Sequence, residues 1–208
     1  MAPSGPEDPM DKRAPADHPI DDLVAARWSP YVFRDEALEA GVVASLLEAA
    51  RWAPSSYNEQ PWRFLVGRKG DAAWQGIHDC LVEPNQAWAQ AAPVLMVSVA
   101  SMRYARGDKP NAHAWHDVGL ATGNLLAEAT ARGLLAHQMG GFFPDRLRER
   151  FGLPEHFEPC AAIAIGHRGD PATAAPELAA REQGPRTRRA VAEFAFGDSW
   201  GQPASLDA

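Results

Sequence analysis

The chain has 208 residues, of which 46% are hydrophobic and 23% are charged. This length and composition predict one globular domain with a sizeable core rather than two domains. The formal net charge of -7 disfavours nucleic acids and anionic membrane surfaces as partners, because both attract a positive surface. We therefore expect a small-molecule partner, with no nucleic acid and no membrane.

The N-terminal segment has none of the features of a targeting sequence. Residues 1–18 have no apolar core and no continuous helical pattern, which excludes a signal peptide and a membrane anchor. We expect a cytoplasmic protein with a disordered acidic leader over residues 1–18. Cys80 and Cys160 form no CxxC pair and have no histidines at ligand spacing, so we expect buried packing residues rather than a disulfide or a metal site.

Helical and strand patterns alternate along the first half of the chain. The expected elements are a helix from about Pro19 to the Ser29–Pro30 break, a helix that opens at Asp35 or Glu36 and stops at Ala53–Pro54, a strand over 62–66, a helix over 72–81 and a buried strand over 93–99.

The second half continues in the same way. The expected elements are a loop over 102–111, a long helix over 112–131, a strand over 134–138, a Gly-Gly turn, a helix over 144–151 and a strand over 161–165. The interleaving predicts a layered α+β protein. We expect a single domain over residues 19–200, a C-terminal arm from about residue 170 that wraps over the body or a partner subunit, and a flexible tail over 201–208.

The long helix over residues 112–131 is expected to be buried on more than one side. Its inward stripe is predicted to consist of Trp115, Val118, Thr122, Leu125 and Ala129. Small residues at Gly119, Gly123 and Ala127 form a second face that lets another helix approach closely. A dimer core and a central helix inside the monomer both explain that face. His113 and His116 lack a third ligand and indicate a helix start rather than a metal site.

Four stretches carry groups that a packed core does not require: Arg27-Trp28-Ser29, Ala53 to Trp62, Gln138 to Phe142, and the arginines between Arg181 and Arg189. Guanidinium and hydroxyl groups suit phosphate oxygens, a loop of hydroxyls and amides suits the edges of a heterocycle, and paired glycines let backbone N–H groups approach a ligand. Each stretch also has a structural interpretation, as a helix end, an ordinary turn or a solvated basic tail.

The order of these stretches resembles the FMN-binding nitroreductase family, over residues from about Ala25 to Phe196. Arg27 and Ser29, with Trp28 between them, resemble the family's Arg-x-Ser, which contacts the FMN phosphate. The most specific match is to the family's Pro-Ser-Ser-x-Asn-x-Gln-Pro-Trp loop, which is reproduced with full spacing by Pro54, Ser55, Ser56, Asn58, Gln60, Pro61 and Trp62.

Three further matches complete the resemblance. Asn85 is similar to the family's asparagine near the flavin ring. Met139, Gly140 and Gly141 resemble a strand end whose backbone N–H groups face the flavin N5 region. Arg186 and Arg188 resemble a late Arg-x-Arg that grips the phosphate.

The resemblance implies a three-layer α-β-α fold with a mixed sheet and an intertwined homodimer. It also implies FMN as cofactor, NADH or NADPH as hydride donor, and an electron-poor acceptor such as a nitroaromatic or a quinone. The flavin carries the chemistry, so no catalytic side chain and no metal is required. The possible walls of the acceptor site are Trp88, Phe142, Phe143 and Trp115, although the helical stripe favours core packing for Trp115.

One position departs from the family pattern. Many relatives have a Lys or Arg two residues after the early Ser, where this chain has Tyr31. Loss of a cation near the pyrimidine edge makes a flavin harder to reduce, unless Arg63, Arg103 or another group replaces it. Two alternatives therefore stay open: a same-fold flavoprotein with a narrower substrate such as an activated aldehyde, an enone or another metabolite, and a flavin-binding protein without catalysis. A helical interaction protein without cofactor is a third.

Overall fold

The computed structural model describes residues 12–206. The helices are α1 (Asp22–Ala26), α2 (Ala40–Arg51), α3 (Ala72–Asp79), α4 (Glu83–Ala89), α5 (Ala114–Ala131), α6 (Pro144–Phe151) and α7 (Pro176–Gln183), with short turns η1 (Ser56–Asn58), η2 (Pro171–Thr173) and η3 (Val191–Glu193). The strands are β1 (Trp62–Arg68), β2 (Val94–Ser101), β3 (Leu135–Met139) and β4 (Phe157–Gly166).

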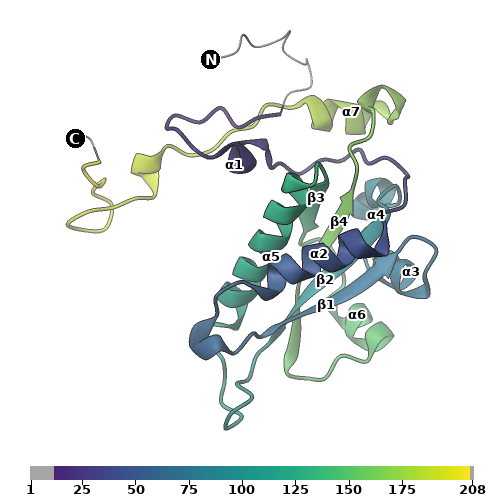
Figure 1. Ribbon diagram of the computed structural model, residues 1–208, viewed down its shortest axis with the longest axis horizontal. Helices are drawn as coiled ribbons and strands as arrows, with labels where there is room; N and C mark the ends of the chain where they lie inside the picture. The colour runs from purple at the N-terminus through teal and green to yellow at the C-terminus, as the bar shows by residue number, and fades with distance from the viewer. Residues whose placement is uncertain (1–11, 207–208) are drawn as a thin grey trace.

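The four strands form one open sheet in the order β1-β2-β4-β3 (Figure 1). All three strand pairs are antiparallel, so the expected α+β class is confirmed but the expectation of mixed strand directions is not. Ser98 pairs with Ala161 and Val99 with Pro159, which leaves Cys160 as an extra residue in β4. Such a bulge locally bends a strand.

Helices cover both faces of the sheet, as the three-layer expectation required. Side chains along β2 alternate between the two faces. Val94, Met96 and Ala100 pack with α2 and α5 in one core. Leu95, Val97 and Val99 pack in the other core, to which α3, α4 and α6 contribute Trp74, Ile77, Trp88 and Leu147. The long apolar run that predicted β2 therefore reflects burial on both faces.

The second helix begins at Ala40 rather than at Asp35 or Glu36, which corrects the expectation. Glu39 has an extended backbone, and the chain before it carries the buried side chain of Leu38 into the core. Lys69 forms an ion pair with Asp35 beside this segment. Tertiary contacts therefore outweigh the helix-opening signal of the acidic pair.

The inward stripe of α5 differs from the predicted one at its first member. Ala114, Val118, Ala121, Leu125 and Ala129 are buried, whereas Trp115 is 50% exposed. The prediction of core packing for Trp115 was wrong because residues 114 and 115 both suit the apolar period and periodicity alone does not fix the rotational phase.

The glycine face of α5 is open in this chain. A Cβ built on Gly119 or Gly123 meets no atom within 4 Å of the described residues. Leu120, beside them, is 36% exposed. The central-helix interpretation therefore fails for this face, and the dimer interpretation remains.

After β4 the chain leaves the sheet and runs over one end of the body as α7 and an extended arm (Figure 1). Arm residues 195 and 204 are joined by a backbone hydrogen bond of 3.0 Å, which closes a terminal loop with Trp200 92% exposed. At the other terminus, Ala14 N–H donates to the Ala25 carbonyl at 2.9 Å, so residues from Lys12 onward lie against α1. Residues 1–11 of the predicted leader and 207–208 of the predicted tail lie outside the described residues.

Candidate functional site

Arg27, Arg186 and Arg188 gather where the C-terminal arm crosses the end of α1. Arg186 donates to the backbone carbonyls of Ala25 at 2.9 Å and of Arg27 at 2.8 Å. Burial and then the charge of Arg188 lower the pKa of Arg27, while burial followed by the charges of Arg27 and Arg188 lowers the pKa of Arg186. Sequence-distant cations are therefore close enough to repel one another, and an anion bound among them would relieve that repulsion.

No carboxylate of the described residues forms an ion pair with these three arginines, although eight other ion pairs are present. The cluster is therefore not a surface salt-bridge network, and it offers donors for a phosphate. The basic-tail interpretation of the late arginines fails for Arg186, because it is partly buried and caps backbone carbonyls.

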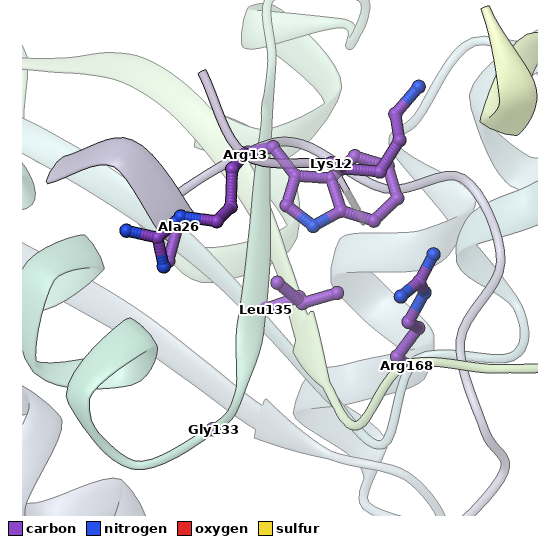
Figure 2. A pocket seen from close by; sticks show the side chains of 7 residues that line it. Lys12, Arg13, Ala26, Gly133, Leu135 and Arg168 are labelled. Atoms are coloured by element: carbon purple, nitrogen blue, oxygen red, sulfur yellow. The ribbon is translucent and has the colours of Figure 1, made fainter. Parts of the chain in front are cut away.

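Ser29 and Trp28 separate in the structure. Ser29 is exposed, whereas Trp28 is 8% exposed and lies between two cations, with Lys12 Nζ at 5.6 Å and the Arg168 guanidinium at 5.4 Å from its ring centroid. The Trp28 side chain lines a cavity of about 380 Å³, and Figure 2 shows Arg13, Leu135 and Arg168 among the residues around it. Arg27 does not line this cavity, so the side chains of Trp28 and Arg27 face different spaces.

The loop from Pro54 to Gln60 is partly or fully exposed along its length, and three of its residues have positive φ angles. Tyr57, Asn58 and Gln60 have φ angles of 53°, 56° and 52°, a left-handed conformation that asparagine tolerates but that is uncommon for tyrosine and glutamine. Gln60 N–H donates to Ser55 Oγ, and Ser56 N–H donates to the buried carboxylate of Asp117, both at 3.0 Å. The loop is thus anchored to the first turn of α5.

Asn85 and Gly141, two residues that the resemblance implied as flavin contacts, touch each other in the structure. The Asn85 side-chain amide donates to the Gly141 carbonyl at 2.9 Å, and Val82 N–H donates to the same oxygen at 3.1 Å. Gly140 is exposed, and within residues 12–206 the amide nitrogens of Gly140 and Gly141 donate to no backbone group outside the ladders. Both amides follow Met139 at the end of edge strand β3, where a ligand has access.

The structure does not bring the loop and the arginines together within one chain. Ser56 contacts Asp117 at the start of α5, whereas Gly133, just after α5, lines the cavity beside Ala26 and Trp28. The fourteen residues of helix from Asp117 to Ala131 separate these two points, which is about 21 Å at 1.5 Å per residue. Figure 1 likewise shows α1 and the C-terminal arm together at one end of α5.

A cluster that the sequence did not predict surrounds Tyr31. Its ring contacts those of Trp88 and His137 edge-on, with centroids at 5.5 and 4.8 Å, and Trp88 stacks on His137 at 4.6 Å. The Arg181 guanidinium lies 3.9 Å over Tyr31. Trp88 Nε1 is buried without a hydrogen-bond partner among the described residues.

Neither arginine that the sequence offered as a substitute cation is near Tyr31. Arg63 donates to the carbonyls of Gln60 and Trp62, and Arg103 pairs with Asp108. Of the suggested wall residues, Trp88 and Phe142 are buried, whereas Phe143 is 40% exposed and stacks with Arg146 at 4.3 Å.

Comparison with known proteins fits this geometry. The protein-family model described as "Nitroreductase family" matches residues 24–167. The chain belongs to the nitroreductase family. The matched segment contains the loop, Asn85 and the glycine pair, but it stops before α7 and the late arginines.

Individual proteins are similar to this chain over most of its length. An uncharacterized 15.4 kDa protein of Mycolicibacterium smegmatis is 37% identical over 148 residues, covering 68% of this chain and 99% of its own length. A NADH dehydrogenase of Thermus thermophilus is 29% identical over 166 residues, covering 65% and 80%. A crystal structure described as an oxidoreductase containing FMN aligns with a TM-score of 0.85 and 35% identity, covering 91% of this chain and 96% of that one.

Two further observations concern membrane-spanning helices and metal sites. Across residues 12–206, every helix is too short or too polar to cross a membrane. In the same residues, no three His, Cys, Asp or Glu side chains cluster as a metal site. Cys80 and Cys160 are free thiols, Cys80 buried and Cys160 partly buried, as expected for packing residues.

Proposed function

We propose that this chain is an FMN-dependent oxidoreductase that passes hydride from NADH or NADPH to a small electron-poor acceptor such as a nitroaromatic or a quinone. Membership of the nitroreductase family and a 35% identical FMN-containing structural neighbour support the cofactor. Homologues named NAD(P)H nitroreductase, from Methanothermobacter thermautotrophicus and Archaeoglobus fulgidus, support the hydride donor and the reaction type. The acceptor class rests on the resemblance.

The residues present fit FMN. Arg27, Arg186 and Arg188 match a phosphate dianion, since charge-assisted hydrogen bonds to arginine are worth about 1.5–3 kcal/mol each. The amides of Gly140 and Gly141, which donate to no backbone group outside the ladders in residues 12–206, suit a heteroatom of a planar ring. This donor set, without competing carboxylates among the described residues, is the observation that carries the proposal.

The separation along α5 supports a site shared between two chains. A span of about 21 Å exceeds what one FMN molecule bridges, so the loop at Ser56 and the arginines of the same chain serve different flavins. A twofold dimer that pairs α5 with its copy in antiparallel orientation puts the loop of one chain beside the arginines of the other. The open faces at Gly119 and Gly123 permit that approach, and Trp115 and Leu120 gain burial by it.

The roles of the residues follow from their positions. Bound FMN supplies the nitrogen N5 that accepts hydride from the nicotinamide. The arginines hold the phosphate, and the loop from Ser55 to Gln60, supplied by the partner chain, orients the ring. Asn85 fixes the Gly141 carbonyl and thereby the direction of the neighbouring amides. No side chain of the site needs to transfer a proton.

The visible spectrum of the purified protein tests the cofactor directly. A flavin spectrum that bleaches on anaerobic mixing with NADH or NADPH, followed by reoxidation with a nitroaromatic or a quinone, is expected. Colourless protein that takes up no added FMN refutes the proposal. Flavin that binds but stays oxidised with both nicotinamides indicates a flavin-binding protein without catalysis.

Mixing two defective chains tests the shared site. Asn58→Ala damages only the loop, and Arg27→Ala with Arg188→Ala damages only the phosphate cluster. Refolded together, the two defective chains should recover flavin binding, because half of the sites in a mixed dimer contain an intact loop and intact arginines. No recovery in isolated mixed dimers indicates that each chain builds its own site.

A further inference from the structure

Helix α7 brings a cation to Tyr31, the position where this chain lacks the Lys or Arg of the family pattern. Arg181, on its last turn, lies with its guanidinium 3.9 Å over the Tyr31 ring. Arg181 is exposed, and within the described residues it forms no ion pair with a carboxylate. Its charge is therefore available to a ligand that covers this surface.

The next residue on α7 fixes that arrangement. Glu182 is 1% exposed, and its Oε2 accepts hydrogen bonds from Tyr31 N–H at 2.7 Å and from Val32 N–H at 3.3 Å. A buried carboxylate is retained only where such donors compensate its loss of water. Glu182 thus ties α7 to the backbone on which Tyr31 stands and keeps the backbone of Arg181 beside the ring, although Glu182 Oε1 has no hydrogen-bond partner among the described residues.

The Arg181 charge reaches the elements that carry the candidate flavin contacts. The Tyr31 ring touches His137, which stands three residues before Gly140, and Trp88, which lies one helical turn after Asn85. Burial, followed by the charge of Arg181, lowers the pKa of His137 even though a hydrogen bond to the Pro30 carbonyl opposes the shift. The electric field of Arg181 therefore extends across Tyr31 to β3.

We propose that Arg181 supplies the positive charge that stabilises reduced FMN, and that Glu182 is the positioning residue that holds Arg181 over Tyr31. This inference rests on the proposed function. Two-electron reduction leaves negative charge on the flavin, and a nearby cation favours that form over the oxidised one. The chain thus recovers through its C-terminal arm a charge that its early segment lacks.

The midpoint potential of bound FMN tests the role of Arg181. Arg181→Gln removes the charge but keeps the length, and it should reduce the ratio of affinities for reduced and oxidised FMN about tenfold, which lowers a two-electron potential by about 30 mV. Arg181→Lys should restore most of the potential. Arg106→Gln, which changes the net charge equally at an exposed loop position, should leave the potential unaltered.

The positioning role needs its own pair of variants. Glu182→Gln keeps an oxygen that accepts from Tyr31 N–H and should keep the potential, whereas Glu182→Ala should lower it as Arg181→Gln does. Equal potentials in the Gln and Ala variants refute the positioning role of Glu182.

Outcomes for this inference and for the proposed function are separable. Full FMN binding with an unchanged potential in Arg181→Gln refutes the role of Arg181 and leaves the proposed function intact. Absence of FMN binding in the unaltered protein refutes both. In the FMN-free protein, proton NMR should show a higher pKa of His137 in Arg181→Gln than in the unaltered chain, and an unchanged value contradicts the placement of the charge.

Discussion

Gly141 offers a sharp test of the contact that joins α4 to the end of β3. A Cβ added there would lie 2.6 Å from Asn85 Nδ2 and 2.9 Å from Val82 Cγ2, whereas a Cβ on Gly140 meets nothing within 4 Å. Gly141→Ala must therefore displace two side chains, and Gly140→Ala displaces none. The two adjacent substitutions form a matched pair that differs in packing alone.

The expected size of the effect follows from these contacts. Turning Asn85 away gives up its hydrogen bond to the Gly141 carbonyl, at about 0.5–1.5 kcal/mol. Moving Val82 off its rotamer costs about 0.5–1.5 kcal/mol more. The sum of about 1–3 kcal/mol lowers the melting temperature by about 2–12 °C in a chain of this size.

Thermal unfolding of the two FMN-free variants, followed by circular dichroism, measures this difference. Gly140→Ala should melt with the unaltered protein. Adding Asn85→Ala to Gly141→Ala should return part of the loss, because it removes the nearer of the two clashing side chains. Equal melting temperatures for Gly140→Ala and Gly141→Ala would overturn the reasoning.

Three further predictions follow from the arm, the bulge and α7. Arg186→Ala removes donors to the Ala25 and Arg27 carbonyls and should lower the free energy of unfolding by about 1–3 kcal/mol in denaturant titrations. Arg188 is exposed, so Arg188→Ala should weaken FMN binding but leave the free energy of unfolding unchanged. Burial raises the pKa of Cys160 to about 12, so iodoacetamide at pH 8 should label it only after unfolding, and rapid labelling of the native protein seen by mass spectrometry would contradict this. Burial, only partly offset by its hydrogen bonds, raises the pKa of Glu182 above 4.5, so the folded state holds that proton more tightly than the unfolded state does. The contribution of Glu182 to the free energy of unfolding is full below pH 4.5 and is lost as the pH rises through the raised pKa. Glu182→Gln should therefore make the free energy of unfolding depend less on pH in that window. An unaltered dependence on pH would contradict the raised pKa of Glu182.

The sequence predicted the elements whose apolar pattern is long or strongly bounded. β2 was recognisable because seven of its eight residues are buried, and α6 because Pro144 opens it and Gly152 ends it in a left-handed conformation. Helices α4 and α7 were missed. The only buried residue of α7 is Glu182, a carboxylate that no apolar template detects, and α4 buries only Trp88 and Ala89.

The candidate site was predictable where its residues are contiguous. The loop from Pro54 to Gln60 is a local motif, and its spacing is visible in the sequence itself. The contact of Arg181 with Tyr31 joins residues 150 positions apart and has no local signature. The division of the site between the two ends of α5 was also invisible, since it depends on three-dimensional distance along a helix.

In the proposed dimer, the distance between the two ends of α5 gives subunit association and cofactor retention a common equilibrium. A ligand held jointly by two chains has no complete site on either one, so each bound flavin adds its binding free energy to that of assembly. Dilution should then release coenzyme and separate subunits in a single transition, and excess FMN should shift this transition to lower protein concentration. In such a protein the prosthetic group acts as part of the quaternary structure.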